Sequence, residues 1–173
     1  MTPKLLPIPK PLGGLYLQEE ITAAWVSTVS AQLTPLAIAT VEEWYPQTSG
    51  RAVRDYMQDE LPALWVYVLP DTTDELAAAL IEVRYSIHWG IAVADGNIRT
   101  AVRVLERIRE EVIVLFSSWD MQGTTDFLTE SGTSCRFGGF TSARPNLESE
   151  NPYFIWTDDR MSIWVAVANP IYE

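Results

Sequence analysis

The side chains best suited to catalysis are scarce in this 173-residue chain, which contains one cysteine and one histidine. Cys135 and His88 could act together as nucleophile and base, but no local signature of such a pair surrounds either residue. One cysteine cannot form an intrachain disulfide, and one cysteine with one histidine cannot supply the several ligands of a Cys/His zinc site. We therefore expect no metal site, and we interpret His88 as an ordinary surface or interface histidine.

Carboxylates are the other candidates for acid–base chemistry. Adjacent acidic pairs occur at Glu19–Glu20, Glu42–Glu43, Glu110–Glu111 and Asp158–Asp159. Neighbouring side chains in a helix or strand point in different directions, so none of these pairs forms a catalytic couple by itself. A small hydrolase that uses Asp126, Asp158 or Asp159 stays open as an alternative, and it requires a cleft that brings two carboxylates together. The sequence has no glycine-rich phosphate loop, G-x-S-x-G or H-E-x-x-H motif, so we expect neither an enzyme nor a cofactor.

The composition restricts the function further. Twelve Lys and Arg against 23 Asp and Glu give a net charge of -11, which is the wrong sign for tight binding to a phosphate backbone. Hydrophobic residues make up 47% of the chain and include seven tryptophans, enough for a substantial core. No stretch approaches the roughly 20 uninterrupted apolar residues that span a bilayer. We therefore expect a soluble protein, made in the cytoplasm, with no membrane partner.

The elements that must position these residues begin with a proline-rich arm at residues 1–16, followed by a single domain over residues 17–173. Apolar residues then recur at every fourth position, which predicts a helix from Leu17 to Leu33. The next two residues are Thr and Pro, a typical helix start, so we predict a second helix or a kinked continuation over residues 34–46. A further helix is predicted over residues 98–116, where apolar residues trace one face.

The remaining patterns predict strands. Branched and aromatic residues fill residues 61–70 on both faces, which predicts a central strand. Apolar residues occupy every odd position from 81 to 93, a period typical of a long, half-buried strand. Residues 153–157 and 161–168 predict an antiparallel hairpin near the end of the chain.

Between the last helix and the hairpin, the sequence becomes rich in Gly, Ser and Thr. We predict a long loop over residues 117–151, with one short strand near residues 134–140. The whole chain then has the order α-(α)-β-β-α-β-β. This order predicts an α+β fold, with a mostly antiparallel twisted sheet and helices packed on one of its faces.

Three arginines, spaced four residues apart, form a positive stripe on the polar side of the helix predicted over residues 98–116. They are Arg99, Arg103 and Arg107. Like charges at this spacing repel each other, which indicates a partner carboxylate at a subunit contact. Nearby glutamates could also compensate the charge within the helix, and we favour a solvated helix face over a subunit contact.

The tryptophans divide into two groups. Trp65 and Trp89 lie in predicted strands, and we expect them in the core or on a sheet face. Trp119 lies between Ser118 and Asp120, and Trp156 directly precedes the polar turn that begins at Thr157. Since Trp is enriched where protein surfaces meet, we expect these two as buried anchors in an assembly.

This order of elements resembles a known family. A leading helix precedes a proline-introduced strand (Leu61–Val68), an acidic polar loop (Asp71–Glu75), a long alternating strand, a helix, and a final hairpin closed by Asp158-Asp159-Arg160. The pattern is similar to that of the tail terminator proteins of tailed bacteriophages. The resemblance covers roughly residues 61–173 and one of the leading helices. It depends on the order of the elements and on their pattern of apolar and polar residues.

The resemblance implies a structural virion protein without catalysis or cofactor. It implies a homo-hexameric ring that ends tail-tube polymerisation and joins the tail to neck or connector proteins, assembled in the host cytoplasm and located in the tail or neck. DNA would pass through an acidic lumen without sequence-specific binding. The proline-rich arm, the extra N-terminal helical length and the loop over residues 117–151 depart from the family pattern. They leave open another neck component, such as a head-closure, tail-completion or adaptor protein.

A ring closed by heterologous contacts needs two different surfaces on each subunit. We expect one surface to combine the polar side of the long strand with the acidic loop. Its candidate residues are Asp71, Thr72, Asp74, Glu75, Arg84 and His88. The second surface would combine the arginine stripe (Arg99, Arg103 and Arg107) with the N-terminal arm, and Trp119 and Trp156 are further interface candidates.

Overall fold

The computed structural model describes residues 15–45, 53–77, 80–121, 135–148 and 152–168. The helices are α1 (Leu15–Gln32) and α2 (Ile98–Met121). The strands are β1 (Thr40–Glu43), β2 (Ala63–Ala77), β3 (Leu80–Asp95), β4 (Cys135–Thr141), β5 (Asn146–Glu148), β6 (Tyr153–Trp156) and β7 (Asp159–Ala168). Single 3-10 turns, η1 (Thr34–Leu36) and η2 (Gln58–Glu60), connect some of them. This content confirms the predicted α+β class.

All these strands belong to one sheet with β3 at its centre. On one side, β3 pairs with β2, and β1 lies beyond β2 as the parallel neighbour. On the other side, β3 pairs with β7 from Leu80 to Trp89 and with β6 from Ala92 to Asp95. β4 continues the sheet beyond β7, and β5 continues it beyond β6. The sheet is therefore mostly antiparallel, as predicted.

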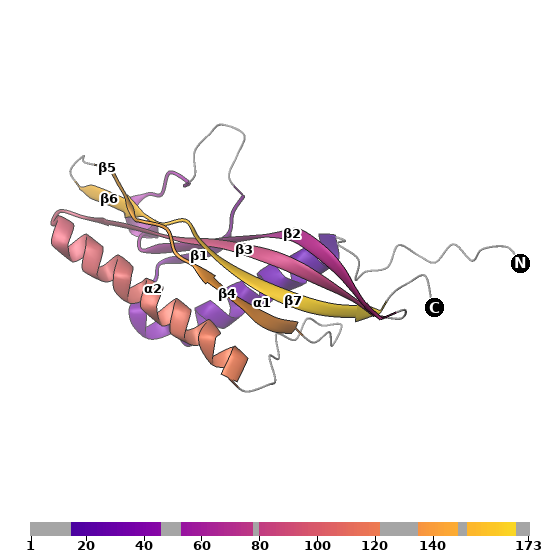
Figure 1. Ribbon diagram of the computed structural model, residues 1–173. Coiled ribbons are helices and arrows are strands. Elements are labelled where there is room, and N and C mark those ends of the chain that lie inside the picture. Colours follow the sequence, from indigo (N-terminus) through magenta and orange to yellow (C-terminus); the bar gives the residue numbers. More distant parts are fainter. Residues whose placement is uncertain (1–14, 46–52, 78–79, 122–134, 149–151, 169–173) are drawn as a thin grey trace, which may run out of the picture.

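Both helices cover the same face of this sheet, which confirms the predicted layers (Figure 1). The two helices meet at Trp25, whose ring stacks on Phe116 with 5.6 Å between centroids and lies 6.4 Å from Trp89. The odd-numbered residues from Val83 to Val93 point into this layer and are buried, as their alternation predicted. The main core thus lies between α1, α2 and one sheet face.

The predicted helix over residues 34–46 is wrong. After the single turn η1, Ala37 has a left-handed backbone with φ of 51°, which ends helical winding. The chain then forms β1, which pairs with β2 from Thr40 opposite Ala63 onward. Apolar residues at helical spacing cannot reveal this pairing, because the partner strand lies more than 20 positions away.

The predicted loop over residues 117–151 is also shorter than expected. α2 continues to Met121, and β4 and β5 lie in the remainder, with β4 confirming the short strand near residues 134–140. Residues 122–134 and 149–151 of this stretch lie outside the described residues.

The acidic segment Asp71–Glu75 is not a loop, because it belongs to β2. Its backbone pairs with β3, from Thr72 opposite Arg84 to Glu75 opposite Ile81, and a register shift between Pro70 and Thr72 leaves Asp71 as an extra residue. Backbone pairing across a hairpin does not require apolar side chains, so these polar residues lengthen the hairpin.

Candidate functional site

The sheet face turned away from α1 and α2 carries several of the predicted interface residues, and we call it the open face. Strand alternation and register place its side chains in rows that cross neighbouring strands. They are Trp65, Tyr67 and Leu69 of β2, Ser86 and His88 of β3, and Arg160 and Ser162 of β7, with Arg84 further along β3. No helix among the described residues covers this face.

One end of the open face has a small apolar cluster of its own. Val53, Ala63 and Ala92 are buried there, and Trp156 packs against them with part of its surface exposed. Arg54 lies beside this cluster and makes ion pairs with two glutamates, at 3.2 Å to Glu42 and 2.5 Å to Glu60. The segment before β2 therefore closes this end of the sheet and leaves the rest open.

An aromatic row runs across the open face and consists of Trp44, Tyr45, Trp65, Tyr67 and His88. Trp44 meets Trp65 edge-on, with 5.7 Å between ring centroids, and Trp65 stacks on Tyr67 at 6.2 Å. Tyr67 in turn contacts Tyr45 at 5.5 Å and stacks on His88 at 4.6 Å, with only 8° between the last two ring planes. Such pairs stabilise a fold beyond the area they bury.

His88 is not the surface residue that its polar neighbours in the sequence suggested. Only 8% of it is exposed, because the Tyr67 ring covers it. Burial, together with the nearby charge of Arg160, lowers the pKa of His88 below its ordinary value of 6.5. The imidazole is therefore neutral at pH 7, and its main role is to extend the aromatic row.

Gly90 allows the row to pack against the sheet. It lies opposite Trp65 in the β2–β3 ladder. A Cβ atom at this position would overlap Cζ2 of Trp65 and the carbonyl oxygen of Thr157. The indole of Trp65, which is fully buried, therefore occupies space that any larger residue at Gly90 would fill.

Beside the aromatic row, the open face contains a groove of about 650 Å³ between β3, β7 and the β4–β5 connection. Its charged lining residues are Asp71, Arg84, Arg144, Asp158 and Arg160. The Nε of Arg84 lies 3.6 Å from Asp71, and the Ser86 hydroxyl donates to the same carboxylate at 3.4 Å. Arg144 and Arg160 also line the groove and make no ion pair with other described residues, although the charge of Arg160 acts on the nearby Asp158.

The groove bears on the hydrolase alternative, which requires two carboxylates in one cleft. Asp71 and Asp158 both line it. Burial raises the pKa of Asp158, and its Oδ1 atom has no hydrogen-bond partner among the described residues. Asp71, by contrast, is held by Arg84 and Ser86. Asp126 lies outside the described residues.

Asp159 is a structural residue and not a free catalytic acid. It is fully buried and accepts hydrogen bonds from Arg109, from Nε at 2.9 Å and from Nη2 at 3.1 Å. The Ala143 amide donates to the same carboxylate at 2.9 Å, and Arg109 donates to the Ala143 carbonyl at 2.6 Å. These contacts connect α2 to β7 and to the segment that borders the groove.

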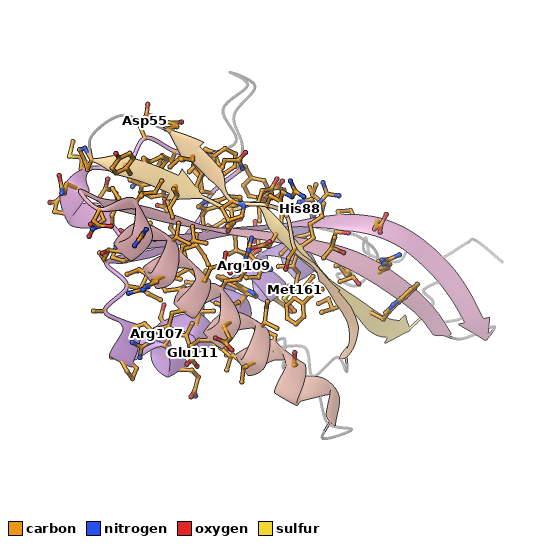
Figure 2. All side chains as sticks on the ribbon, turned by 60° about the vertical axis from the view of Figure 1, so that its left-hand side comes forward. Asp55, His88, Arg107, Arg109, Glu111 and Met161 are labelled. Carbon is orange, nitrogen blue, oxygen red and sulfur yellow. The ribbon has the colours of Figure 1, made fainter. Side chains whose placement is uncertain are left out.

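Arg109 lies on the core side of α2, unlike the arginines of the stripe. Its side chain lies between α2 and the sheet (Figure 2) and is only 8% exposed as a residue. The helix already contained the signal, because Arg109 is four residues after Leu105 and three before Val112, both fully buried. Its position on the core side was therefore readable from the helical period.

The arginine stripe of α2 is separate from the open face. Arg99, Arg103 and Arg107 are exposed, as expected for either a solvated face or a subunit contact. Figure 2 shows Arg107 and His88 on opposite sides of the molecule. Val102 and Val114 of α2 are also exposed, Val114 to 58%, so this helix presents apolar surface beside its charges.

The other predicted interface residues divide between the groove and the part of the chain without described side chains. Asp71, Arg84 and Trp156 line the groove together, so the structure unites these three. Thr72, Asp74 and Glu75 lie on β2, but their side chains, like that of Trp119, are outside what the structure describes. Sequence reasoning missed Arg144 and Arg160, because only the fold brings the β4–β5 connection beside the groove-lining end of β7.

The described part of the chain contains neither a metal-binding cluster nor a membrane-spanning helix. Its His, Cys, Asp and Glu side chains form no group of three or more that could hold a metal ion. Neither α1 nor α2 has the length and apolar character that crossing a membrane requires.

Comparisons with known proteins establish the fold alone. No protein-family model matches the sequence, and no curated protein matches it at a significant level. One similar solved structure, whose title states no function, has a TM-score of 0.50 and 14% identity over 88% of this chain and 97% of its own. Another belongs to a structure titled "Virion of native gene transfer agent (GTA) particle", with a TM-score of 0.41 and 13% identity over 84% of this chain and 94% of its own.

Proposed function

We propose that this chain is a structural component of the virion of a tailed phage or a phage-like particle, and that it acts there as a tail terminator. In this role, six copies of the chain form a ring. The ring ends tail-tube polymerisation and joins the tail to the neck. The proposal starts from the resemblance of the sequence to tail terminators. The observation that carries it further is the one-sided fold, with helices on one sheet face and a grooved, aromatic open face on the other.

A one-sided subunit has the two different surfaces that a closed ring of heterologous contacts requires. The outer side of α2 offers the arginine stripe beside the exposed Val102 and Val114. β2 contributes the exposed Asp71, and the sequence places Asp74 and Glu75 further along the same strand. Opposite charges on separate surfaces favour contact between the stripe of one copy and the β2 acids of the next. Each copy then presents one positive and one negative surface.

The proposed passage of DNA places a condition on the lumen. A net charge of -11 opposes tight binding to phosphates. The groove, however, is lined by Arg84, Arg144 and Arg160 against Asp71 and Asp158, so it is not an acidic surface. An acidic lumen would therefore be lined by residues outside the groove.

The ring can be tested by native mass spectrometry and negative-stain imaging of the full chain at micromolar concentration, with and without tail-tube protein. We expect six-fold rings. Arg103→Glu should abolish them, because it places a negative charge against the acids of the neighbouring copy, whereas Arg103→Lys should retain them. A wild-type protein that remains monomeric under all these conditions would contradict the ring.

Two alternatives have distinct outcomes in the same preparation. A head-closure or adaptor protein would bind the connector but would not stop the growth of tail tubes in a polymerisation assay. The hydrolase alternative rests on Asp71 and Asp158 in the groove and on the raised pKa of Asp158. It predicts a hydrolytic activity against glycosidic substrates that Asp158→Asn removes while the fold is retained.

A further inference from the structure

The aromatic row has one exposed end, at the outer edge of β2. Tyr45 is 44% exposed and Leu69 is 42% exposed, although both have large apolar surfaces. Tyr45 lies against Tyr67, and Leu69 follows Tyr67 on the same side of β2. Tyr67 itself is only partly buried. The three side chains therefore form a continuous aromatic and aliphatic surface that faces solvent.

At this exposed end, the carboxylates near Tyr45 and Tyr67 act more strongly on the two rings than the positive charge of Arg160 does. Burial raises the pKa of Tyr45, and the nearby carboxylates of Glu43 and Glu19 raise it further. Burial and then the charge of Asp158 raise the pKa of Tyr67 in the same direction. A surface of tyrosine rings among carboxylates suits a segment that is apolar and positively charged.

The first fourteen residues of the chain have this chemistry. They contain Pro3, Pro7, Pro9 and Pro11, with apolar residues between them. Their charged side chains are two lysines, with no acidic residue. Proline-rich segments favour the polyproline II conformation, and aromatic surfaces bind such segments at little entropic cost.

The first turn of α1 begins beside this surface. The side-chain amide of Gln18 donates to the Val68 carbonyl at 3.0 Å, and Val68 is the neighbour of both Tyr67 and Leu69. Gly13 and Gly14 directly precede α1 and permit a change of chain direction there. Twelve residues in polyproline II conformation extend roughly 37 Å, whereas the helix layer is about 10–12 Å thick. The segment can therefore pass around the edge of β2 to the open face.

We propose that residues 1–12 bind in polyproline II conformation to the surface formed by Tyr45, Tyr67 and Leu69 of the same chain. Attachment beside the surface gives the segment a high effective concentration there, which favours its own chain over a second copy. The bound segment covers apolar surface that otherwise faces water, and its lysines lie among the carboxylates of Glu19 and Glu43. This inference does not require the proposed ring, and it places the N-terminal arm on the open face instead of beside the arginine stripe.

Disulfide trapping in the full chain tests the contact. In a Cys135→Ser background, Ile8→Cys is combined either with Leu69→Cys at the proposed surface or with Ala23→Cys as the matched control. Ala23 is exposed on α1, about 12 Å along the helix from its start, so the same tether reaches it away from the open face. A disulfide forms only when the two Cα atoms come within about 7 Å. We expect the cysteines at positions 8 and 69 to form an intramolecular disulfide about tenfold faster than the control pair. The reason is that a bound segment stays near position 69, whereas it only occasionally reaches position 23.

Two further variants separate binding from simple proximity. Replacement of Pro7, Pro9 and Pro11 by serine, which changes no core residue, should reduce the Leu69 rate to that of the control. Tyr45→Ala should do the same. Equal rates for the Leu69 and Ala23 pairs in the parent protein would overturn the contact. Covalent dimers in place of an intramolecular product would overturn its assignment to the same chain.

Discussion

The buried pair of Arg109 and Asp159 offers the sharpest test of how this fold is held together. Arg109→Met removes the guanidinium and keeps a side chain of similar length. It leaves Asp159, whose side chain is only 1% exposed, with the Ala143 amide as its remaining partner among the contacts described above. The change therefore isolates the cost of a buried carboxylate without its counter-ion.

The magnitude follows from burial and geometry. Removal of one partner from a buried ion pair costs about 3–5 kcal/mol, because the other charge stays desolvated. Arg109→Met also removes the hydrogen bonds that Arg109 donates to Glu106 and to the Ala143 carbonyl. No other described contact replaces these bonds or the ion pair. For a chain of this size, such a loss lowers the midpoint of thermal unfolding by about 6–20 °C.

The measurement is equilibrium unfolding in urea, followed by tryptophan fluorescence at pH 7. Arg103→Met is the matched control, since it makes the same substitution at an exposed position of the same helix and should change the free energy of unfolding by no more than about 0.5 kcal/mol. Replacement of both partners, Arg109→Met with Asp159→Leu, should recover most of the loss, because no unpaired charge then remains. If Arg109→Met is as mild as Arg103→Met, the pair does not stabilise the fold and this reasoning is refuted.

Two other predictions concern the aromatic row. Gly90→Ala should lower the free energy of unfolding by about 1–3 kcal/mol, because the new methyl group overlaps Trp65. Gly96→Ala, with open space around it, is the control and should be nearly neutral. Equal effects of the two substitutions in urea unfolding would exclude the overlap. His88 is the chain's single histidine, so its imidazole signal in an NMR titration is unambiguous and should show a pKa below 6.5. The unfolded chain then binds the proton more readily than the folded chain, so His88 should make stability fall as pH decreases below about 6.5. His88→Gln should remove this part of the pH dependence. An unchanged slope of the unfolding free energy against pH would show that His88 is not buried under Tyr67.

Much of the element content was predictable because it depends on local periods. The fourfold spacing of Ile21, Trp25 and Val29 identified α1 to within two residues at its start, and the odd-numbered apolar residues of β3 identified its buried face. The same reasoning failed between residues 34 and 46, where a short apolar pattern fits a helix as well as a strand. There the parallel partner β2 decided the outcome.

The candidate site was less predictable than the elements. Asp71 and Arg84 were expected at an interface and do line the groove, but Arg144 and Arg160 join them only because β5, β6 and β7 bring the end of the chain back to β3. His88 was expected at the surface because its neighbours along the strand are polar. Its burial comes from Tyr67, a residue 21 positions earlier that the ladder places directly opposite.

The sequence by itself determined which segments alternate, which wind into helices, that the net charge is -11, and that few groups suit catalysis. These properties are local or are simple counts, so no partner is needed to read them. Tertiary structure alone decided that one sheet face stays open and that Arg109 reaches Asp159 over 50 positions. It also decided that an aromatic row lies across two strands. The physical reason is that burial and pairing of a side chain depend on what the fold places against it, and that neighbour is seldom adjacent in the sequence.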